Sequence, residues 1–109
     1  MATFFRNEVV KNVGTTPVKV IETNGATRAT VIGLSFTNLT DKFVYVNVEL
    51  QSQDSARGFY LKDSILPSGT SLRAVSSGEK LILATSNAMY VSATLGDSVD
   101  VIISYVEIT

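Results

Sequence analysis

The sequence predicts an all-β fold, namely a single antiparallel β-sandwich of about eight strands. Three observations support this. Apolar residues alternate with a period of two along most of the chain, turn-forming residues recur about every 8 to 12 positions, and no window has the pattern of an amphipathic helix. Jelly-roll-like and immunoglobulin-like connections both fit this spacing, and the pattern does not choose between them.

The clearest alternation lies at residues 43–50, FVYVNVEL. Valine and leucine hold every second position there, which predicts a strand with one buried face. Phe43 and Tyr45 lie on the opposite side of this strand, which is expected to face solvent. In the preceding run, TVIGLSFT, every second position is apolar and is held by Ile32, Leu34 and Phe36, which predicts a further strand.

Two polar breaks in the first half are predicted to close β-hairpins. Asn24-Gly25 is a strong hairpin signal because both residues tolerate a positive φ. Residues 38–42, NLTDK, have the Asn, Thr and Asp composition of a tight turn between neighbouring strands.

Further turns divide the second half. Residues 67–69, PSG, cannot lie inside a central strand, because proline has no amide donor and glycine favours a turn. Turns are also predicted at residues 76–78, 86–87 and 96–98.

The last run, SVDVIISYVEIT, is apolar on both sides. This predicts a central strand, or a strand whose outer face meets a partner. One side carries Val99, Val101, Ile103 and Tyr105, and the other carries Ile102, Val106 and Ile108.

The chain of 109 residues is long enough for one domain and too short for two ordinary ones. We therefore expect a single sandwich over residues 13–109, with residues 1–12 as an N-terminal arm or a first strand. No stretch reaches the roughly 18 apolar residues of a membrane span, and no signal peptide is recognisable. The formal net charge of −1 does not favour nucleic acid as a partner.

Histidine and cysteine are both absent. Histidine is the usual general base near neutral pH and the commonest metal ligand, so we predict no enzyme, no catalytic residue, no metal and no cofactor. Asp97 and Asp100 are too few for a calcium loop and are better explained by a turn. The serines lack a G-x-S-x-G motif and are interpreted as turn residues.

Exposed apolar side chains are the more informative class, because a cluster of them marks a contact surface. Phe4 and Phe5 either fold back onto their own sandwich or reach a neighbouring subunit. Aromatic β faces also bind sugars, although the chain has no tryptophan for a sugar platform. The candidate contact residues are Phe4, Phe5, Phe43, Tyr45, Ile102, Val106 and Ile108.

Several stretches together resemble small β-sandwich structural proteins and domains of tailed bacteriophages. The shared pattern is a lysine–acid pair, an aliphatic residue before Pro-x-Gly, a strand that begins with lysine, and a closing DVIISYVEI-like strand. The opening of the sandwich, ATVIGLSFTNLTDKFVYVNVEL, is also similar to this family. The matching positions in the second half are residues 62–63, 66–69, 80–83, 91–94 and 100–108.

This resemblance implies a structural component of a virion, in the head, neck or tail, with no catalytic residue. Its expected partners are copies of itself, as a homo-oligomer, and other virion proteins. Its expected location is the virion, after synthesis in the cytoplasm of a bacterial host. The alternative hypothesis is a small β-sandwich module that binds a glycan or a cell surface.

Overall fold

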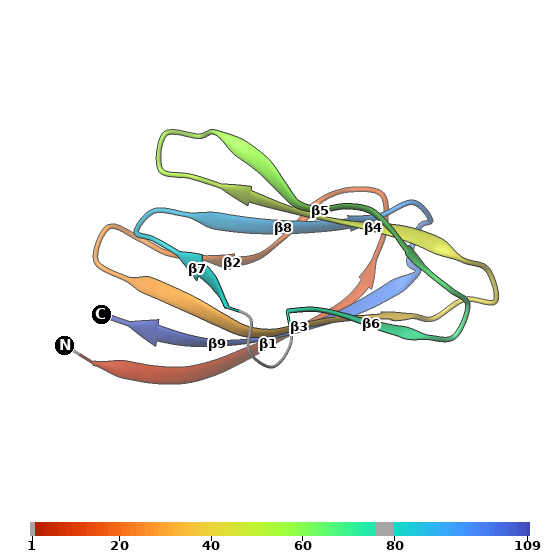
Figure 1. Ribbon diagram of the computed structural model, residues 1–109, viewed down its shortest axis with the longest axis horizontal. Coiled ribbons are helices and arrows are strands. Elements are labelled where there is room, and N and C mark those ends of the chain that lie inside the picture. Colours follow the sequence, from red (N-terminus) through yellow and green to blue (C-terminus); the bar gives the residue numbers. More distant parts are fainter. Residues whose placement is uncertain (1, 76–79) are drawn as a thin grey trace.

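The computed structural model of the chain describes residues 2–75 and 80–109. These residues form nine β-strands and no helix (Figure 1), which confirms the all-β prediction. The strands are β1 (Thr3–Val13), β2 (Val18–Glu22), β3 (Arg28–Asn38), β4 (Val44–Gln51), β5 (Arg57–Leu66), β6 (Ser71–Val75), β7 (Leu81–Leu83), β8 (Ala88–Ala93) and β9 (Val99–Ile108).

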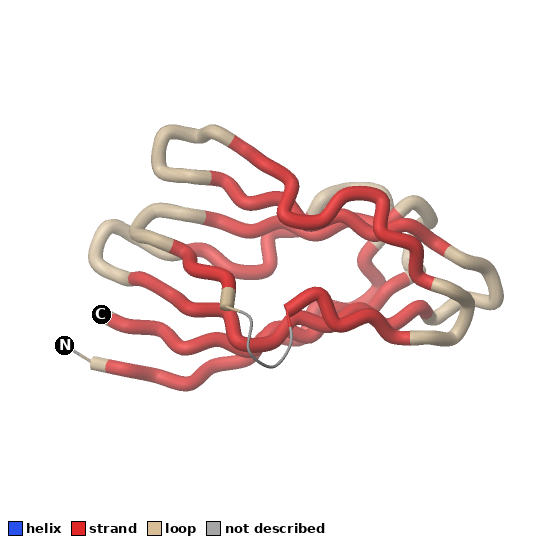
Figure 2. Tube along the Cα trace, viewed as in Figure 1, coloured by secondary structure: helices blue, strands red, loops and turns tan. Residues whose placement is uncertain are grey.

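The strands form two antiparallel sheets that face each other, as the tube in Figure 2 shows. The first sheet has the order β1-β9-β3-β6, with β7 also paired to β3. The second sheet has the order β2-β8-β4-β5. β6 pairs with Leu34–Thr37 of β3 and β7 pairs with Ala29–Val31, so β6 and β7 occupy successive places along one edge.

The pairing of the strands is nested. β1 pairs with β9, β2 with β8, β3 with β6 and β7, and β4 with β5. This is the connection pattern of a jelly roll, in which the chain passes repeatedly from one sheet to the other. Of the two topologies compatible with the sequence, the chain therefore adopts the jelly roll.

Both predicted hairpins are wrong. β2 lies in the second sheet and β3 in the first, so Asn24 and Gly25 lie in a connection between sheets; the same holds for residues 38–42, between β3 and β4. The local turn chemistry is present, since Asn24 Oδ1 accepts a hydrogen bond from the Ala26 amide at 2.8 Å. Turn residues specify that the chain reverses, whereas the pairing of distant strands decides which sheet it then joins.

Asn38 ties two of these connections together. Its buried side-chain amide donates to the carbonyls of Lys42 (2.7 Å), Leu66 (3.0 Å) and Pro67 (3.2 Å). Its Oδ1 accepts from the amide and the hydroxyl of Thr40. One buried side chain thus holds the β3–β4 passage against the β5–β6 passage, with its polar atoms satisfied.

The core lies between the sheets and uses the positions expected for β4 and β9. The exception is in β3, where Ile32 is 43% exposed whereas Leu34 and Phe36 are fully buried. The register between β3 and β9 shifts between Val31 and Gly33. This bulge places Val31 in the core in place of Ile32, because an extra residue reverses the side to which the following side chains point.

The turns at residues 67–69, 86–87 and 96–98 are present as local reversals. Gly69 has a φ of 64°, and the amide and hydroxyl of Thr70 both donate to the Pro67 carbonyl. The turn predicted at residues 76–78 lies outside the described residues.

Candidate interaction surfaces

The outer side of the first sheet carries a group of exposed or half-exposed apolar side chains. β9 lies in the middle of this sheet, between β1 and β3, as its two apolar sides predicted. Its odd positions from Val99 to Tyr105 are buried, so its even positions point to solvent. We call this surface the aliphatic face, and it consists of Phe5, Val9, Ile32, Ile82, Ile102, Val106 and Ile108.

These side chains lie next to one another across the strands. Phe5 pairs with Val106, and Val9 pairs with Ile102. Thr30 of β3 lies between Val106 and Ile82 of β7. Residues directly opposite each other in antiparallel strands point to the same side of the sheet, so the face is continuous from β1 to β7.

The remaining positions of the aliphatic face are small or uncharged. Asn7 pairs with Ser104, and Ser104 pairs with Gly33. A shallow hollow of about 190 Å³ lies over Gly33, Ser104 and Ile102. Arg28 lies opposite Ile108, at one end of the face. Arg73 of β6 also lines this hollow, and Asp100 is the next outward position of β9 after Ile102. Fixed charge is therefore absent from the row of Asn7, Ser104 and Gly33, and is present beside Ile102.

Phe4 does not belong to this face, because consecutive residues of a strand point to opposite sides. It lies on the inner side of β1, with the Arg6 guanidinium carbon 5.0 Å from its ring centroid. Arg6 also forms an ion pair with Glu107 at 3.2 Å. Phe4 is 42% exposed and Phe5 is 81% exposed, so the structure separates the two neighbours.

The outer side of the second sheet is different in kind. We call it the aromatic face, and it consists of Phe43, Tyr45, Phe59, Ile65 and Tyr90. Phe43 and Tyr45 pack edge to face with centroids 5.7 Å apart. Lys62 lies over Phe59 and Arg57 lies over Tyr90, so all four rings of this face have partners within the chain.

Charged side chains interleave the aromatic face. The Arg57 guanidinium lies 4.0 Å from the centroid of Tyr90 and pairs with Glu49 at 2.6 Å. Lys19 pairs with Glu22 at 3.0 Å, and this hydrogen bond is the main reason that the pKa of Lys19 is raised. Arg57 and Lys19 are therefore each paired with a carboxylate on this side of the molecule.

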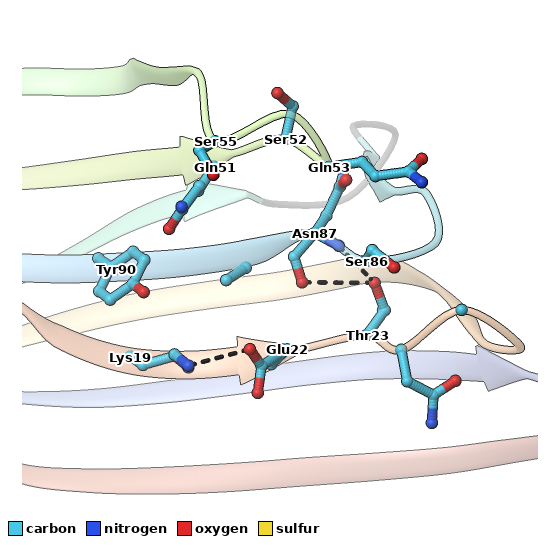
Figure 3. Close-up of a pocket in the computed structure, with 13 residues that line it drawn as sticks. Lys19, Glu22, Thr23, Gln51, Ser52, Gln53, Ser55, Ser86, Asn87 and Tyr90 are labelled. Atoms are coloured by element: carbon cyan, nitrogen blue, oxygen red, sulfur yellow. Dashed lines mark hydrogen bonds and ion pairs between the residues drawn. The ribbon is translucent and has the colours of Figure 1, made fainter.

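A polar cleft of about 710 Å³ opens beside Tyr90, at the end of the second sheet (Figure 3). Amide and hydroxyl side chains from three separate loops converge on it, as the labelled sticks in Figure 3 show. Within the described residues, the side chains of Gln51, Gln53 and Ser86 have no hydrogen-bond partner. The cleft can therefore donate to and accept from an uncharged polar ligand.

Over residues 2–75 and 80–109, no three His, Cys, Asp or Glu side chains are grouped so that they could hold a metal ion. In the same part of the chain, no helix is long and apolar enough to cross a membrane. Gly96 and Asp97 form a turn, with Asp97 at a φ of 51°, as the turn interpretation of this acid predicted.

The structure places four of the predicted contact residues, Phe5, Ile102, Val106 and Ile108, on the aliphatic face. Phe43 and Tyr45 lie on the aromatic face, on the other side of the sandwich. Sequence reasoning missed Val9, Ile32 and Ile82. The alternation of residues 5, 7 and 9 could have placed Val9 on the same side as Phe5. The exposure of Ile32 depends on a bulge that cannot be predicted from the local sequence.

No known protein family matches the chain, and no curated protein matches it. Among solved structures, it is similar to a protein of Bacillus endospore appendages, described as disulfide-linked pili. That similarity has a TM-score of 0.60 and 9% identity, over 98% of this chain and 88% of the other.

Structures of infectious bursal disease virus and its particles are also similar, at TM-scores below 0.5. The Gt strain gives 0.49 with 10% identity, over 97% of this chain and 32% of the viral chain. The subviral particle of the protein VP2 gives 0.48 with 7% identity, over 97% and 36%. At these identities the comparisons show a shared fold alone, and the similarity to the Bacillus appendage protein, with its TM-score of 0.60, supports that fold.

Proposed function

We propose that this protein is a non-enzymatic structural component of a virion, that of a tailed bacteriophage, and that it works through protein–protein contacts in a symmetric assembly. The observation that carries this proposal is the aliphatic face. Copies of the chain and other particle proteins are the proposed partners, and the head, neck and tail are the proposed positions.

The aliphatic face favours contact for a physical reason. Phe5, Val9 and Ile82 are each at least 60% exposed, which leaves a large apolar area in water. Burying such a side chain stabilises a complex by about 1.5 to 3 kcal/mol. Contiguous exposed apolar patches on a folded domain mark interaction sites.

The same face suits contact between identical copies. A twofold axis brings a surface against itself, so a charge near the axis meets its own sign. Asn7, Ser104 and Gly33 occupy the middle of the face and bring no charge there. A symmetric assembly repeats each contact many times, so that a modest contact per copy suffices.

The resemblance at residues 62–63, 66–69 and 100–108 supports the tailed-phage part of the proposal. The fold shared with the Bacillus appendage protein is compatible with an assembly role. Those pili are described as disulfide-linked. This chain has no cysteine, so its own contacts would be non-covalent.

Sedimentation velocity over a wide concentration range tests the proposal. We expect the unmodified chain to associate as the concentration rises. Ile102→Lys places a charge on the central strand of the aliphatic face and should weaken association at least about tenfold, since a buried unpaired charge is costly. Tyr45→Lys is the matched control on the aromatic face and should associate normally. A concentration-independent monomer, or equal losses in both variants, would overturn the assignment to the aliphatic face.

The polar cleft supports a second candidate function, the binding of a neutral saccharide. Its amides and hydroxyls match sugar hydroxyls, and its ionic groups, Lys19 and Glu22, already pair with each other. A panel of neutral oligosaccharides on an array is the probe. Gln53→Ala should abolish any binding, whereas Thr16→Ala, in the β1–β2 connection, should not. An array without bound sugar removes this candidate.

A further inference from the structure

The two sheets have four edges, and three of them are protected against pairing with another chain. β2 has five residues and a register shift. The β6–β7 edge is made of two segments. β5 has two register shifts, and Asp63 within it has a φ of 49°. Short strands, bulges and irregular backbone are the usual means of blocking an edge.

β1 lacks these protections over most of its length. It has eleven residues and pairs with β9 without a register shift from Thr3 to Val10. No described strand lies on its other side, as the red strand at the lower edge of Figure 1 shows. An exposed strand of this length and regularity is a template for an additional strand.

The hydrogen bonds of Ala2 show which backbone groups face the open edge. Ala2 and Thr109 exchange both of their amide-to-carbonyl bonds, at 3.3 and 2.9 Å. Such pairs alternate along an antiparallel ladder, so the even residues of β1 bond to β9. The amides and carbonyls of the odd residues, among them Phe5, Asn7 and Val9, therefore point to the open edge.

We propose that β1 pairs antiparallel with β1 of a second copy, about a twofold axis that passes through Asn7. Phe5 then lies opposite Val9 of the second copy, and Arg6 lies opposite Glu8 of the second copy. The inference deepens the proposed function, on which it rests, by naming a partner and the strand that holds it. The two first sheets become one continuous sheet.

Charge selects this register. A twofold axis perpendicular to the sheet keeps the outer sides of both copies on one side of the joined sheet. Odd residues of β1 then pair with odd residues of the second copy, so the sum of two paired residue numbers is always even. With Asn7 on the axis, Arg6 meets Glu8 twice, once on each side. The neighbouring registers place Arg6 opposite Arg6, or Glu8 opposite Glu8. Opposite charges across a strand pair are stabilising, whereas like charges directly opposite are destabilising.

The apolar positions agree with the same register. Phe5 and Val9 are on the outer side, so each Phe5 extends the apolar row of one copy onto Val9 of the other. Phe4 lies opposite Val10 of the second copy on the inner side. The aliphatic faces of the two copies thereby form one surface on the same side of the joined sheet, available for further contacts.

Charge reversal tests the pairing. Arg6→Glu and Glu8→Arg, made singly, should each weaken dimer formation at least about tenfold in sedimentation equilibrium, because each creates two like-charge pairs. The double variant R6E/E8R exchanges the partners and should return the dimer to within a few-fold of the unmodified chain. Glu107→Gln is the control, because it removes the 3.2 Å partner of Arg6 within its own copy without touching the edge.

A cysteine placed on the axis tests the register independently. The chain has no cysteine, so Asn7→Cys introduces a single thiol. In a hydrogen-bonded antiparallel pair the Cα atoms are about 5.5 Å apart, which a disulfide can span. Mild oxidation should cross-link Asn7→Cys into a dimer and should leave Thr3→Cys, on the same side of β1 but far from the axis, as monomer.

The outcomes separate this pairing from the aliphatic-face contact. If all three charge variants associate like the unmodified chain, and Asn7→Cys does not cross-link, the β1 pairing is wrong while the aliphatic-face contact stands. If the double variant Ile102→Lys/Asn7→Cys still cross-links into a dimer but forms no larger species, both contacts are supported. If the unmodified chain never self-associates, both fail.

Discussion

The two outer faces of this sandwich differ in how far the chain satisfies its own exposed groups. On the second sheet, Phe43 packs on Tyr45, and Arg57 covers the ring of Tyr90 while pairing with Glu49. On the first sheet, Ile102 and Val106 have no ring partner, and the residues directly opposite them on the neighbouring strands are uncharged: Val9, Ser35, Phe5 and Thr30. The aromatic face is largely engaged within its own molecule, whereas the aliphatic face leaves apolar area in water.

Exposure alone therefore does not identify a contact surface. Phe43 is 58% exposed and Ile102 is 48% exposed, so the two side chains are similar by that measure. What separates them is their surroundings: Phe43 has an aromatic partner, whereas Ile102 lies opposite Val9 in a face that contains further exposed apolar side chains and no such ring partner. A row of this kind can be covered by another flat face, which buries many side chains at once.

The largest expected effect compares the two sides of one strand. Ile103 is fully buried, so Ile103→Ala should lower the free energy of unfolding by about 2 to 5 kcal/mol through the lost contact and the cavity. Ile102→Ala should change it by less than about 0.5 kcal/mol at low protein concentration, because Ile102 points to solvent. Urea denaturation of both variants measures this. A large loss at Ile102 would mean that the aliphatic face supports the fold itself.

A smaller effect is expected on the aromatic face. Arg57→Ala removes both the 2.6 Å ion pair with Glu49 and the stacking on Tyr90. These groups are partly exposed, so we expect a loss of at most about 1 kcal/mol in the free energy of unfolding. Self-association should be unchanged in sedimentation velocity. Weaker association would show that the aromatic face also holds a partner.

The smallest effect concerns the inner side of the first sheet, next to β1. Burial raises the pKa of Tyr105 above its ordinary value, and the charges of Glu8 and Glu107 raise it further. The neutral phenol is thus favoured in the folded chain, so its contribution is fully present below pH 10. It should be lost as the pH rises through the folded pKa. The melting temperature of Tyr105→Phe should decline less steeply above pH 10 than that of the unmodified chain. Identical pH profiles for the two proteins would show that Tyr105 does not cause this loss of stability.

The strand pattern was predictable where one side of a strand is uniformly aliphatic. The buried valines of β4 and the buried odd positions of β9 follow directly from alternation, because a side chain on an extended chain has only two directions. Alternation failed in β3, where the bulge at Val31 moves Ile32 to the surface. This bulge depends on how β3 pairs with β9, and the local sequence of β3 does not specify that pairing.

The candidate surfaces were predictable only as separate residues. Ile102 and Val106 stood out because a strand with two apolar sides needs two neighbours. Their grouping with Ile82, and the separation of Phe5 from Phe43, depend on which strands share a sheet. Asn24-Gly25 illustrates the same point, since its turn forms while the hairpin does not.

Local sequence is enough to specify that this chain is built from antiparallel strands around an aliphatic core, because the alternation of side chains along a strand repeats every two residues. The nested pairing of the jelly roll, the bulge between Val31 and Gly33, and the grouping of distant apolar positions in one face all arise only in the folded chain. These features depend on contacts between residues far apart in the chain. Their free energy belongs to pairs of strands and cannot be assigned to either strand alone.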